Sequence, residues 1–379
     1  MKARLGDVCT VVSGSTPKST VPEYWDGDIK WITPAELSND TYIINDSARH
    51  ITALGVAKTG LKPFPAGTVI LSSRAPIGKT AIAGCEMFCN QGFKNLICSE
   101  KIDSKYLYYF LSGKTDYLNS LGRGATFKEI SKAIVESIEI PLPEIEEQKR
   151  IAAHFERLLR LIQLQKAELE ELDKLVKSRF IELFGDYDLT HPQESWVTIK
   201  EIGTVVGGAT PKTDHDEYWG GSYRWITPAE LDADSGYIYD SVRKLTKAGV
   251  ESCSLQEMPV GTVILSSRAP IGKVAIAGNT FYCNQGFKNI ICKEGITPRY
   301  LYTVLLLNVE YLNSLGRGAT FKEISKGIVE SIRIPVPSME LQERFAAFVE
   351  QTDKSKLAVQ KGLQELEILK KSLMQQYFG

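Results

Sequence analysis

The chain consists of one sequence unit that occurs twice. Four segments of the first half recur in the second half at a constant offset of 194 residues, so that residue 31 corresponds to 225 and residue 117 to 311. The matched segments are Trp31–Leu37 with Trp225–Leu231, Gly67–Lys79 with Gly261–Lys273, Cys89–Asn95 with Cys283–Asn289, and Tyr117–Lys132 with Tyr311–Lys326. Two copies are too few for a stacked repeat array. The duplication therefore predicts two equivalent domains related by a pseudo-twofold axis.

Each copy begins with a part that has the pattern of an α/β domain. Short apolar runs such as Gly67–Ser73 and Lys94–Cys98 are separated by glycines and prolines, which is typical of strands joined by turns. One helical stretch interrupts them near Ser104–Leu121. We therefore expect two α/β domains with mixed sheets, over residues 1–143 and 186–337.

Each domain is followed by a long amphipathic segment, residues 144–185 and 338–379. Apolar side chains recur there at every third or fourth position, which indicates a helix with one apolar stripe. The stripe residues are Ile151, Phe155, Leu158, Ile162, Leu169, Leu172, Val176, Phe180 and Leu183, and then Phe345, Val349, Val359, Leu363, Leu366, Leu369 and Leu373. Each helix is roughly 60 Å long at 1.5 Å per residue. A single domain is too small to cover an apolar stripe of that length. The pattern favours packing of the two helices against each other, with Gly362 loosening the second helix; packing of each helix on its own domain is the alternative.

Composition indicates a globular chain outside a membrane. The 379 residues are 43% hydrophobic and 24% charged, and the longest apolar runs are too short to cross a bilayer. The start of the sequence has no signal-peptide pattern. Seven cysteines form no CxxC pair, which favours buried thiols in a reducing cytoplasm. A metal site is the minor alternative because the four histidines are scattered.

The net charge of −1 conceals locally basic segments. Gly261–Lys293 contains four basic residues and no acid, whereas acids gather at Asp232, Asp234 and Asp240. Local basic segments can bind phosphate even when the whole chain is neutral.

The motifs as a set resemble those of one protein family. The long helices are preceded by Pro141–Ile151 and Pro335–Phe345, and the domains carry Ser13–Pro17, Gly67–Arg74, Asn90–Phe93 and Gly124–Phe127. With the order domain, helix, domain, helix, this set resembles the specificity (S) subunit of Type I restriction–modification systems over essentially the whole chain.

The resemblance implies a non-catalytic subunit that recognises double-stranded DNA. It implies two target recognition domains held apart by an antiparallel coiled coil, each reading one half of a bipartite site. Two methyltransferase (M) subunits, which use S-adenosylmethionine, methylate one adenine per half-site, and two motor–nuclease (R) subunits join for restriction. This chain itself needs no cofactor. Because the two domains are close copies, we expect a near-palindromic target.

Enzyme interpretations fail on residue type. Gly78-Lys79-Thr80 is similar to the end of a Walker A loop, but Ser73 stands where that loop needs glycine. No Asn/Asp-Pro-Pro-aromatic loop of an adenine methyltransferase and no paired His/Cys spacing of a zinc enzyme occurs. We expect Asp26 and Asp28 to be solvated turn residues and not a metal pair.

Basic and amide side chains in Gly- and Ser/Thr-rich loops are the DNA-binding candidates, because such loops bring cations and backbone N–H groups close to phosphate. Arginine can pair with guanine, and asparagine or glutamine with adenine. The candidates are Lys18, Arg74, Lys79, Asn90, Gln91, Lys94, Arg123 and Lys128, with their copies Lys212, Arg268, Lys273, Asn284, Gln285, Lys288, Arg317 and Lys322.

Each candidate also has a structural interpretation. Arg74 and Lys79 are equally explained as surface charges, and Asn90 and Gln91 as side chains that brace a turn. The segments that differ between the copies, Ser38–Ser47 and Asp232–Ser241, are alternative sites of base readout. Trp25, Trp31, Trp219 and Trp225 are expected in the core.

Two other functions stay open at this point. One is a recognition subunit of a restriction class in which methylation and cleavage share one polypeptide. The other is a coiled-coil interaction protein unrelated to DNA. The neighbouring genes distinguish the first from a Type I system, and a DNA-binding assay with a methyltransferase partner tests the second.

Overall fold

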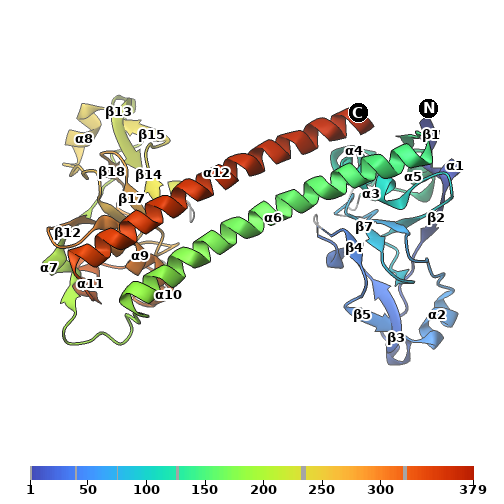
Figure 1. The fold of residues 1–379 in the computed structure, drawn as a ribbon, viewed down its shortest axis with the longest axis horizontal. Coiled ribbons are helices and arrows are strands. Elements are labelled where there is room, and N and C mark those ends of the chain that lie inside the picture. Colours follow the sequence, from blue (N-terminus) through green and yellow to red (C-terminus); the bar gives the residue numbers. More distant parts are fainter. Residues whose placement is uncertain (1, 39–40, 75, 125–127, 232–235, 319–321) are drawn as a thin grey trace. The chain divides into compact units, whose positions relative to one another are not determined.

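The structure is a computed structural model in which both sequence repeats have the same architecture (Figure 1). It describes residues 2–379 apart from 39–40, 75, 125–127, 232–235 and 319–321. Asp232, Asp234 and the Ala125–Phe127 part of one motif lie outside the described residues. The chain forms two compact units: unit 1 comprises residues 1–167 and 360–379, and unit 2 comprises residues 168–359.

The first repeat alternates short strands and short helices before one long helix. Its elements are β1 (Lys2–Arg4), α1 (Leu5–Val8), β2 (Cys9–Ser13), β3 (Trp25–Ile32), β4 (Ile43–Ile44), β5 (Arg49–Ile51), α2 (Ala53–Thr59), β6 (Val69–Leu71), β7 (Thr80–Ala83), β8 (Phe88–Cys89), β9 (Lys94–Cys98), α3 (Ser104–Ser112), α4 (Thr115–Leu121), α5 (Lys132–Ser137), β10 (Glu139–Pro141) and α6 (Ile145–Phe184).

The second repeat follows the same order. Its elements are β11 (Val197–Thr198), α7 (Ile199–Ile202), β12 (Gly203–Gly207), β13 (Trp219–Ile226), β14 (Tyr237–Ile238), β15 (Arg243–Leu245), α8 (Lys247–Ser252), β16 (Val263–Leu265), β17 (Val274–Ala277), β18 (Tyr282–Cys283), β19 (Lys288–Cys292), α9 (Pro298–Leu307), α10 (Val309–Ser314), α11 (Lys326–Ser331), β20 (Arg333–Ile334) and α12 (Met339–Phe378).

Both domains contain mixed sheets, which confirms the predicted fold class. In the first repeat a five-stranded sheet has the order β2-β9-β6-β7-β4, in which only the β7–β4 pair is parallel. A three-stranded sheet has the order β5-β3-β8, with β3 and β8 parallel. The second repeat has the same strand order in both sheets. The main core of the first repeat lies where the five-stranded sheet meets α3, and fully buried Leu71 and Leu107 belong to it.

A buried glutamine fastens each long helix to its domain. Gln148, on the first turns of α6, is fully buried. Its Oε1 accepts the backbone N–H of Asp103 at 2.9 Å, and its Nε2 donates to the carbonyls of Lys101 and Pro143. Gln342 makes the equivalent hydrogen bonds at the start of α12. The start of each helix is therefore fixed relative to the domain that precedes it.

The two long helices run antiparallel. In unit 1 the ring of Phe155 on α6 stacks on that of Phe378 on α12, with ring centroids 5.8 Å apart. In unit 2 the ring of Phe180, near the end of α6, packs against the ring of Phe345, near the start of α12. Their ring centroids lie 5.3 Å apart. The first part of one helix thus pairs with the last part of the other in both units, which confirms the predicted direction and shows that packing on the parent domain is not the only contact.

Burial along the stripe is uneven. The aromatic ends are buried, whereas Leu169 and Leu172 are half-buried and Leu369 is 46% exposed, contrary to its predicted place in the seam. Gly362 lies within a continuous α12 and does not interrupt it. A Cβ there would lie 2.8 Å from the end of the Gln165 side chain of α6, so α6 and α12 lie next to each other at this position.

Two other expectations have different outcomes. Three of the four tryptophans are core residues as predicted, since Trp25, Trp31 and Trp225 are at most 7% exposed, whereas Trp219 is only partly buried against its cluster. Asp26 and Asp28, however, lie within β3 and not in a turn. The register of β3 with β5 shifts between Trp25 and Ile29, and Asp26 has a φ of +60°. A bulge therefore projects both carboxylates into solvent, because the extra residues of a bulge leave the strand ladder.

Candidate nucleic-acid interface

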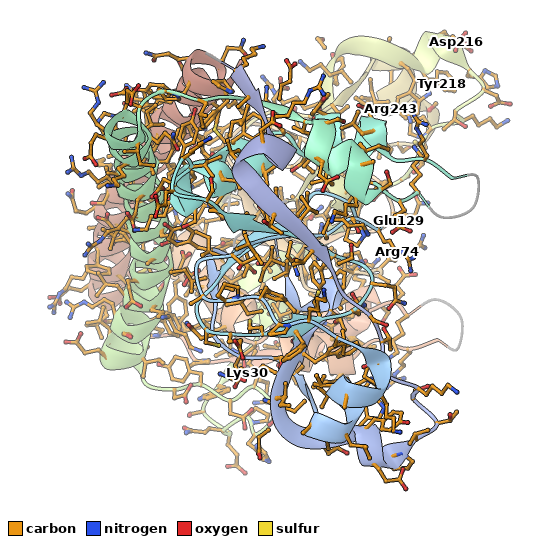
Figure 2. The ribbon with its side chains drawn as sticks, turned by 90° about the vertical axis from the view of Figure 1, so that its right-hand side faces the viewer. Lys30, Arg74, Glu129, Asp216, Tyr218 and Arg243 are labelled. Atoms are coloured by element: carbon orange, nitrogen blue, oxygen red, sulfur yellow. The ribbon has the colours of Figure 1, made fainter. Side chains whose placement is uncertain are left out.

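The predicted cationic loops of the first repeat meet at one carboxylate, that of Glu129. The Nε atom of Arg74 lies 2.9 Å from Glu129 Oε2, and Lys94 Nζ lies 3.1 Å from Oε1. Backbone hydrogen bonds of 3.0 and 2.9 Å pair Arg123 with Glu129, and Figure 2 shows Arg74 beside Glu129 at the surface of the domain. We call these residues the Glu129 cluster: Arg74, Lys94, Arg123, Lys128 and Glu129.

The carboxylate of Glu129 stays charged because of its cationic neighbours. Burial by itself raises the pKa of this carboxyl group, but hydrogen bonds from Lys94 and Arg74 outweigh burial and hold its pKa below the usual range. The cluster has four basic side chains and one acidic side chain, so it keeps an excess of positive charge. Such an excess attracts polyanions.

The second repeat reproduces this geometry closely. Arg268 Nε lies 3.0 Å from Glu323 Oε2, and Lys288 Nζ lies 3.1 Å from Oε1. Burial raises the pKa of the Glu323 carboxyl group here too. Hydrogen bonds from Lys288 and Arg268 outweigh burial and hold this pKa below its usual range. We call these residues the Glu323 cluster: Arg268, Lys288, Arg317, Lys322 and Glu323.

Within the Glu129 cluster the basic side chains differ in exposure. The Lys94 side chain is only 8% exposed, whereas that of Arg74 is 45% exposed. Arg123 and Lys128 are also exposed. A Cβ at Gly122 would lie 2.9 Å from the end of the Ile77 side chain, so the chain beside Arg123 packs closely on Ile77. Lys94 is thus part of the scaffold, and the other three basic residues face solvent.

The amide and lysine candidates near the cluster are bound to backbone or to neighbouring loops. Lys79 Nζ donates to the Leu37 carbonyl. Asn90 Oδ1 accepts the N–H of Gly92 at 2.9 Å, and Gln91 Oε1 accepts the hydroxyl of Thr16. Their copies Lys273, Asn284 and Gln285 make the corresponding contacts. These contacts favour the turn-bracing interpretation, whereas Lys18 and Lys212 are exposed.

Comparison with known proteins identifies the family. A model described as the Type I restriction modification DNA specificity domain matches residues 1–174 and again residues 194–368. The chain belongs to this family.

Relatives within the specificity family come from archaea and bacteria. The chain is 43% identical over 185 residues to the type I restriction enzyme MjaIX specificity subunit of Methanocaldococcus jannaschii, a match that covers 47% of this chain and 43% of that protein. It is 24% identical over 408 residues to the MjaVIII specificity subunit of the same organism, which covers 98% of this chain and 90% of the relative. The EcoR124I/EcoR124II specificity subunit of Escherichia coli is 26% identical over 284 residues, a match that covers 70% of this chain and 68% of that protein.

Two solved structures share the specificity-family fold. One comes from a study of complex assembly and conformational transition of the type I R-M system, with a TM-score of 0.65 and 18% identity over 100% of this chain and 97% of that one. The other is the crystal structure of the S subunit from M. genitalium, with a TM-score of 0.59 and 17% identity over 100% and 96%.

Sequence reasoning missed two features of this specificity-family chain. Glu129 and Glu323 were not singled out, although the Phe-Lys-Glu-Ile-Ser segment that holds them occurs in both repeats. The second feature is an arginine stacked on a tryptophan: the Arg49 guanidinium lies 3.7 Å from the centroid of the Trp25 ring. Arg243 lies 3.5 Å from the Trp219 ring in the other repeat. Identical offsets in both repeats were the available signal.

Among the described residues of this chain, no group of three or more His, Cys, Asp or Glu side chains is arranged to hold a metal ion. All seven cysteines are free, and Cys9, Cys89 and Cys283 are buried. None of the described helices is both long and apolar enough to span a membrane.

Replacing Glu129 with glutamine should destabilise the first domain of this specificity-family chain. The Lys94 ammonium group would lose its counter-charge while it stays buried, which costs about 2–3 kcal/mol. The lowered pKa means that the stabilisation by Glu129 is present above the ordinary carboxyl pKa and is lost as pH falls through the folded-state pKa. Denaturation curves of the native chain and E129Q should therefore differ at neutral pH and converge as the pH falls below the ordinary carboxyl range.

The control is Glu136→Gln, which removes the partner of Lys132 in an exposed ion pair. That change should cost less than about 1 kcal/mol. Equal costs for the two variants at neutral pH would contradict the assigned role of Glu129.

Proposed function

We propose that this chain is the DNA-recognition subunit of a Type I restriction–modification complex and that each repeat binds one half of a bipartite target. The observation that carries this proposal is the duplicated cluster, in which an internal carboxylate orders basic side chains at the surface of each domain. The order of the chain supports residues 1–143 and 186–337 as the two target recognition domains, with 144–185 and 338–379 as the connecting helices.

The solvent exposure of each basic side chain indicates its role within the cluster. Arg123 and Lys128 face solvent, and Arg74 uses Nε for Glu129, which leaves its terminal nitrogens available for a ligand. Exposed arginines can donate two hydrogen bonds to guanine in the major groove or bind phosphate. Lys94 acts indirectly, because its ammonium group holds Glu129 in place. The copies Arg268, Arg317, Lys322 and Lys288 have the same roles in the second repeat.

Catalysis belongs to partner subunits in this proposal. The chain lacks the residue sets of a nucleotide-binding, methyltransferase or zinc site, so two M subunits supply S-adenosylmethionine and methylate adenine, and two R subunits supply restriction. The purified chain alone should neither methylate nor cut DNA, whereas its addition to the M subunit of its own system should direct methyl transfer to a defined site. Methyl transfer by the chain free of any partner would contradict the proposal.

Similarity of the two clusters leads to a further expectation about the target. The distances from arginine to glutamate, 2.9 and 3.0 Å, agree between the repeats, so both domains present similar chemistry. Readers related by a twofold axis bind similar sequences on opposite strands. Methylation mapping should show a half-site and its approximate reverse complement around a nonspecific spacer. Two unrelated half-sites would place base readout in the segments that differ, Ser38–Ser47 and Asp232–Ser241.

A further inference from the structure

The stretches that differ between the repeats begin beside the cationic loops. In the second repeat Lys273 Nζ donates to the Leu231 carbonyl at 3.0 Å, and β14 follows as an edge strand parallel to β17. Lys79 and Leu37 make the same contact in the first repeat, where β4 follows beside β7. Side chains that differ between the domains are therefore carried next to the candidate interface. We call the described parts of these stretches the differing segments: residues 41–47 and 236–241.

A buried arginine packs against the differing segment of unit 2. The Arg299 side chain lies on the first turn of α9 and is only 10% exposed. Its guanidinium carbon lies 4.7 Å from the centroid of the Tyr237 ring. A Cβ at Gly236 would lie 2.7 Å from a terminal nitrogen of the same guanidinium, so the backbone of the segment passes directly against it. This differing segment is therefore seated on a buried cation.

The same guanidinium connects the differing segment to the long helix of unit 2. Arg299 Nη2 donates to Asp353 Oδ2 on α12 at 2.8 Å. Because the Arg299 side chain is buried, this carboxylate is its counter-charge and fixes it in one place. The planar guanidinium can stack on Tyr237 and pair with Asp353 at the same time, which the ammonium group of a lysine cannot do. Arg299 thus holds the segment at a defined position relative to α12.

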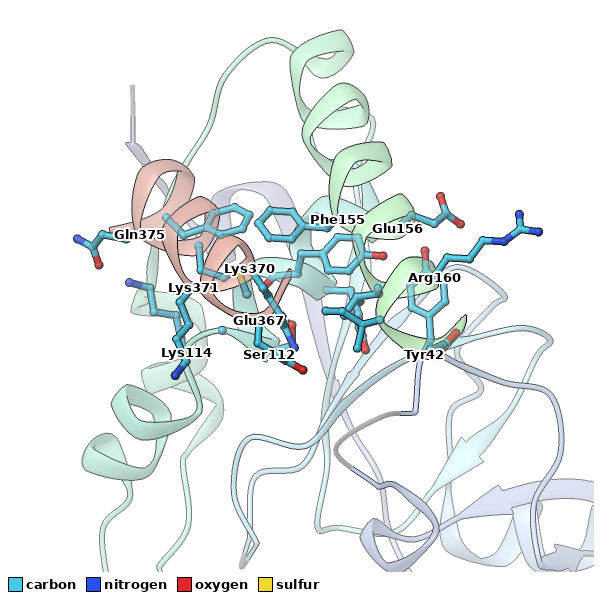
Figure 3. Close-up of a pocket in the computed structure, with 18 of the residues that line it drawn as sticks. Tyr42, Ser112, Lys114, Phe155, Glu156, Arg160, Glu367, Lys370, Lys371 and Gln375 are labelled. Atoms are coloured by element: carbon cyan, nitrogen blue, oxygen red, sulfur yellow. Dashed lines mark hydrogen bonds between the residues drawn. The ribbon is translucent and has the colours of Figure 1, made fainter. Parts of the chain in front are cut away.

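Unit 1 connects its differing segment to its long helix through aromatic rings. The Tyr42 ring stacks on the Tyr109 ring of α3, with centroids 6.0 Å apart. Tyr109 in turn stacks on Phe155 of α6 at 5.2 Å. All three side chains line one cavity of unit 1, of about 870 Å³ (Figure 3). The differing segment of unit 1 is therefore held at the same place in the fold by other chemistry.

Each differing segment and its anchor have changed together between the repeats. Three positions that lie in contact in unit 2 have other residues in unit 1: Gly236, Arg299 and Asp353 correspond to Tyr42, Lys105 and Leu159. The ring that supports the anchor is the same in both, since Tyr302 corresponds to Tyr108. The exchange is thus concentrated where the segment meets its support, which indicates that the support is matched to the segment.

We propose that Arg299 and Tyr42 are positioning residues that fix how the differing segments meet DNA, and that each sets the base preference of its own half-site. The inference rests on the proposed function. Arg299 is buried and acts through Tyr237, whose ring stacks on that of Tyr239 at 6.0 Å. Tyr239 is 61% exposed, and an exposed ring can make apolar contact with the thymine methyl group. The half-sites then share the bases read by the two clusters and differ where the differing segments contact DNA.

The test maps methylated adenine after the full chain is assembled with the M subunit of its own system, S-adenosylmethionine and a library of DNA sites. Arg299→Lys installs the residue of the first repeat, keeps the charge beside Asp353 and loses the planar stack on Tyr237. Methylation of sites with one wrong base in one half-site should rise at least about tenfold relative to the cognate site, because a mismatch ordinarily costs about that much or more. The other half-site should keep its preference.

Variants of Tyr42 supply the reciprocal result. Tyr42→Ala removes the ring that stacks on Tyr109, so it should relax only the half-site that Arg299→Lys leaves unchanged. Tyr42→Phe keeps the ring and should keep the native preference. Opposite half-sites for the two positions are the result that a general loss of stability would not produce.

Val349→Ala is the control for stability alone. Val349 is 2% exposed on α12 and belongs to the main core of the second repeat. Its truncation should lower the unfolding temperature of unit 2 and leave the methylated motif unchanged. An unchanged motif in both Arg299→Lys and Tyr42→Ala would overturn the inference, as would equal relaxation by Val349→Ala; the proposed function would survive either result. A native chain that directs no site-specific methylation would overturn both.

Discussion

Replacing Phe345 with alanine should lower the free energy of unfolding of unit 2 by about 3–5 kcal/mol, the usual cost of removing a buried phenyl ring. The side chain is fully buried, and its ring lies 5.3 Å from that of Phe180 and 5.6 Å from that of Phe184. Its loss removes the contact through which the start of α12 meets the end of α6. Calorimetry of the full chain should show one of the two unit transitions shifted to a lower temperature.

Leu357→Ala on the same helix is the control. That side chain is 67% exposed, so its removal should change the unfolding free energy by less than about 0.5 kcal/mol. Equal effects at Phe345 and Leu357 would contradict the pairing of α6 with α12. From sequence alone, Leu169→Asp with Leu172→Asp is predicted to cost several kcal/mol; both leucines are half-buried, so the aromatic ends of the helices are the more sensitive positions.

The double variant Arg123→Ala with Arg317→Ala should weaken DNA binding by the assembled complex more than any other surface change. An arginine that reads a base contributes about 1–3 kcal/mol, so the pair should cost at least about tenfold in affinity and relax one target position in each half-site. If the arginines contact phosphate instead, affinity falls for all DNA sequences. The slope of log affinity against log salt concentration then becomes shallower by about one for each arginine removed. Binding isotherms at several salt concentrations separate these two results.

Two control variants accompany this experiment. Arg157→Ala, an exposed position on α6, removes the same charge outside the clusters and should leave affinity within about twofold. Lys94→Ala should chiefly reduce stability, because that side chain is buried against Glu129. Unchanged affinity in the Arg123/Arg317 variant would mean that these loops are scaffold and that DNA is bound elsewhere.

Local patterns explain which parts of the fold were predictable. The duplication, strand β9, the helical stretch around α3 and α4, and both long helices follow from periodicity and from proline and glycine positions, which act over a few residues. The bulge at Asp26 was not predictable, because it depends on the register between β3 and β5. Short helices such as α2 and α5 are too brief to show a period.

The candidate site was predictable only as a list of basic residues. Their arrangement depends on Glu129, which is 55 positions from Arg74 in sequence and hydrogen-bonded to it in space. An acid inside a basic motif gives no local signal of this role. The difference between the buried Lys94, which begins β9, and the exposed Arg123 is likewise a property of the tertiary structure, since each follows a glycine closely in the sequence.

The division of the chain into units has a consequence for the order of folding during synthesis. Unit 1 contains the first 167 residues, but it also needs residues 360–379, whereas unit 2 is complete once residue 359 has been made. The rings of Phe155 and Tyr106 in unit 1 both pack against Phe378, which is made after all of unit 2. The unit that the ribosome begins first is therefore the one that finishes last, and its apolar helix face stays uncovered throughout translation of the second repeat.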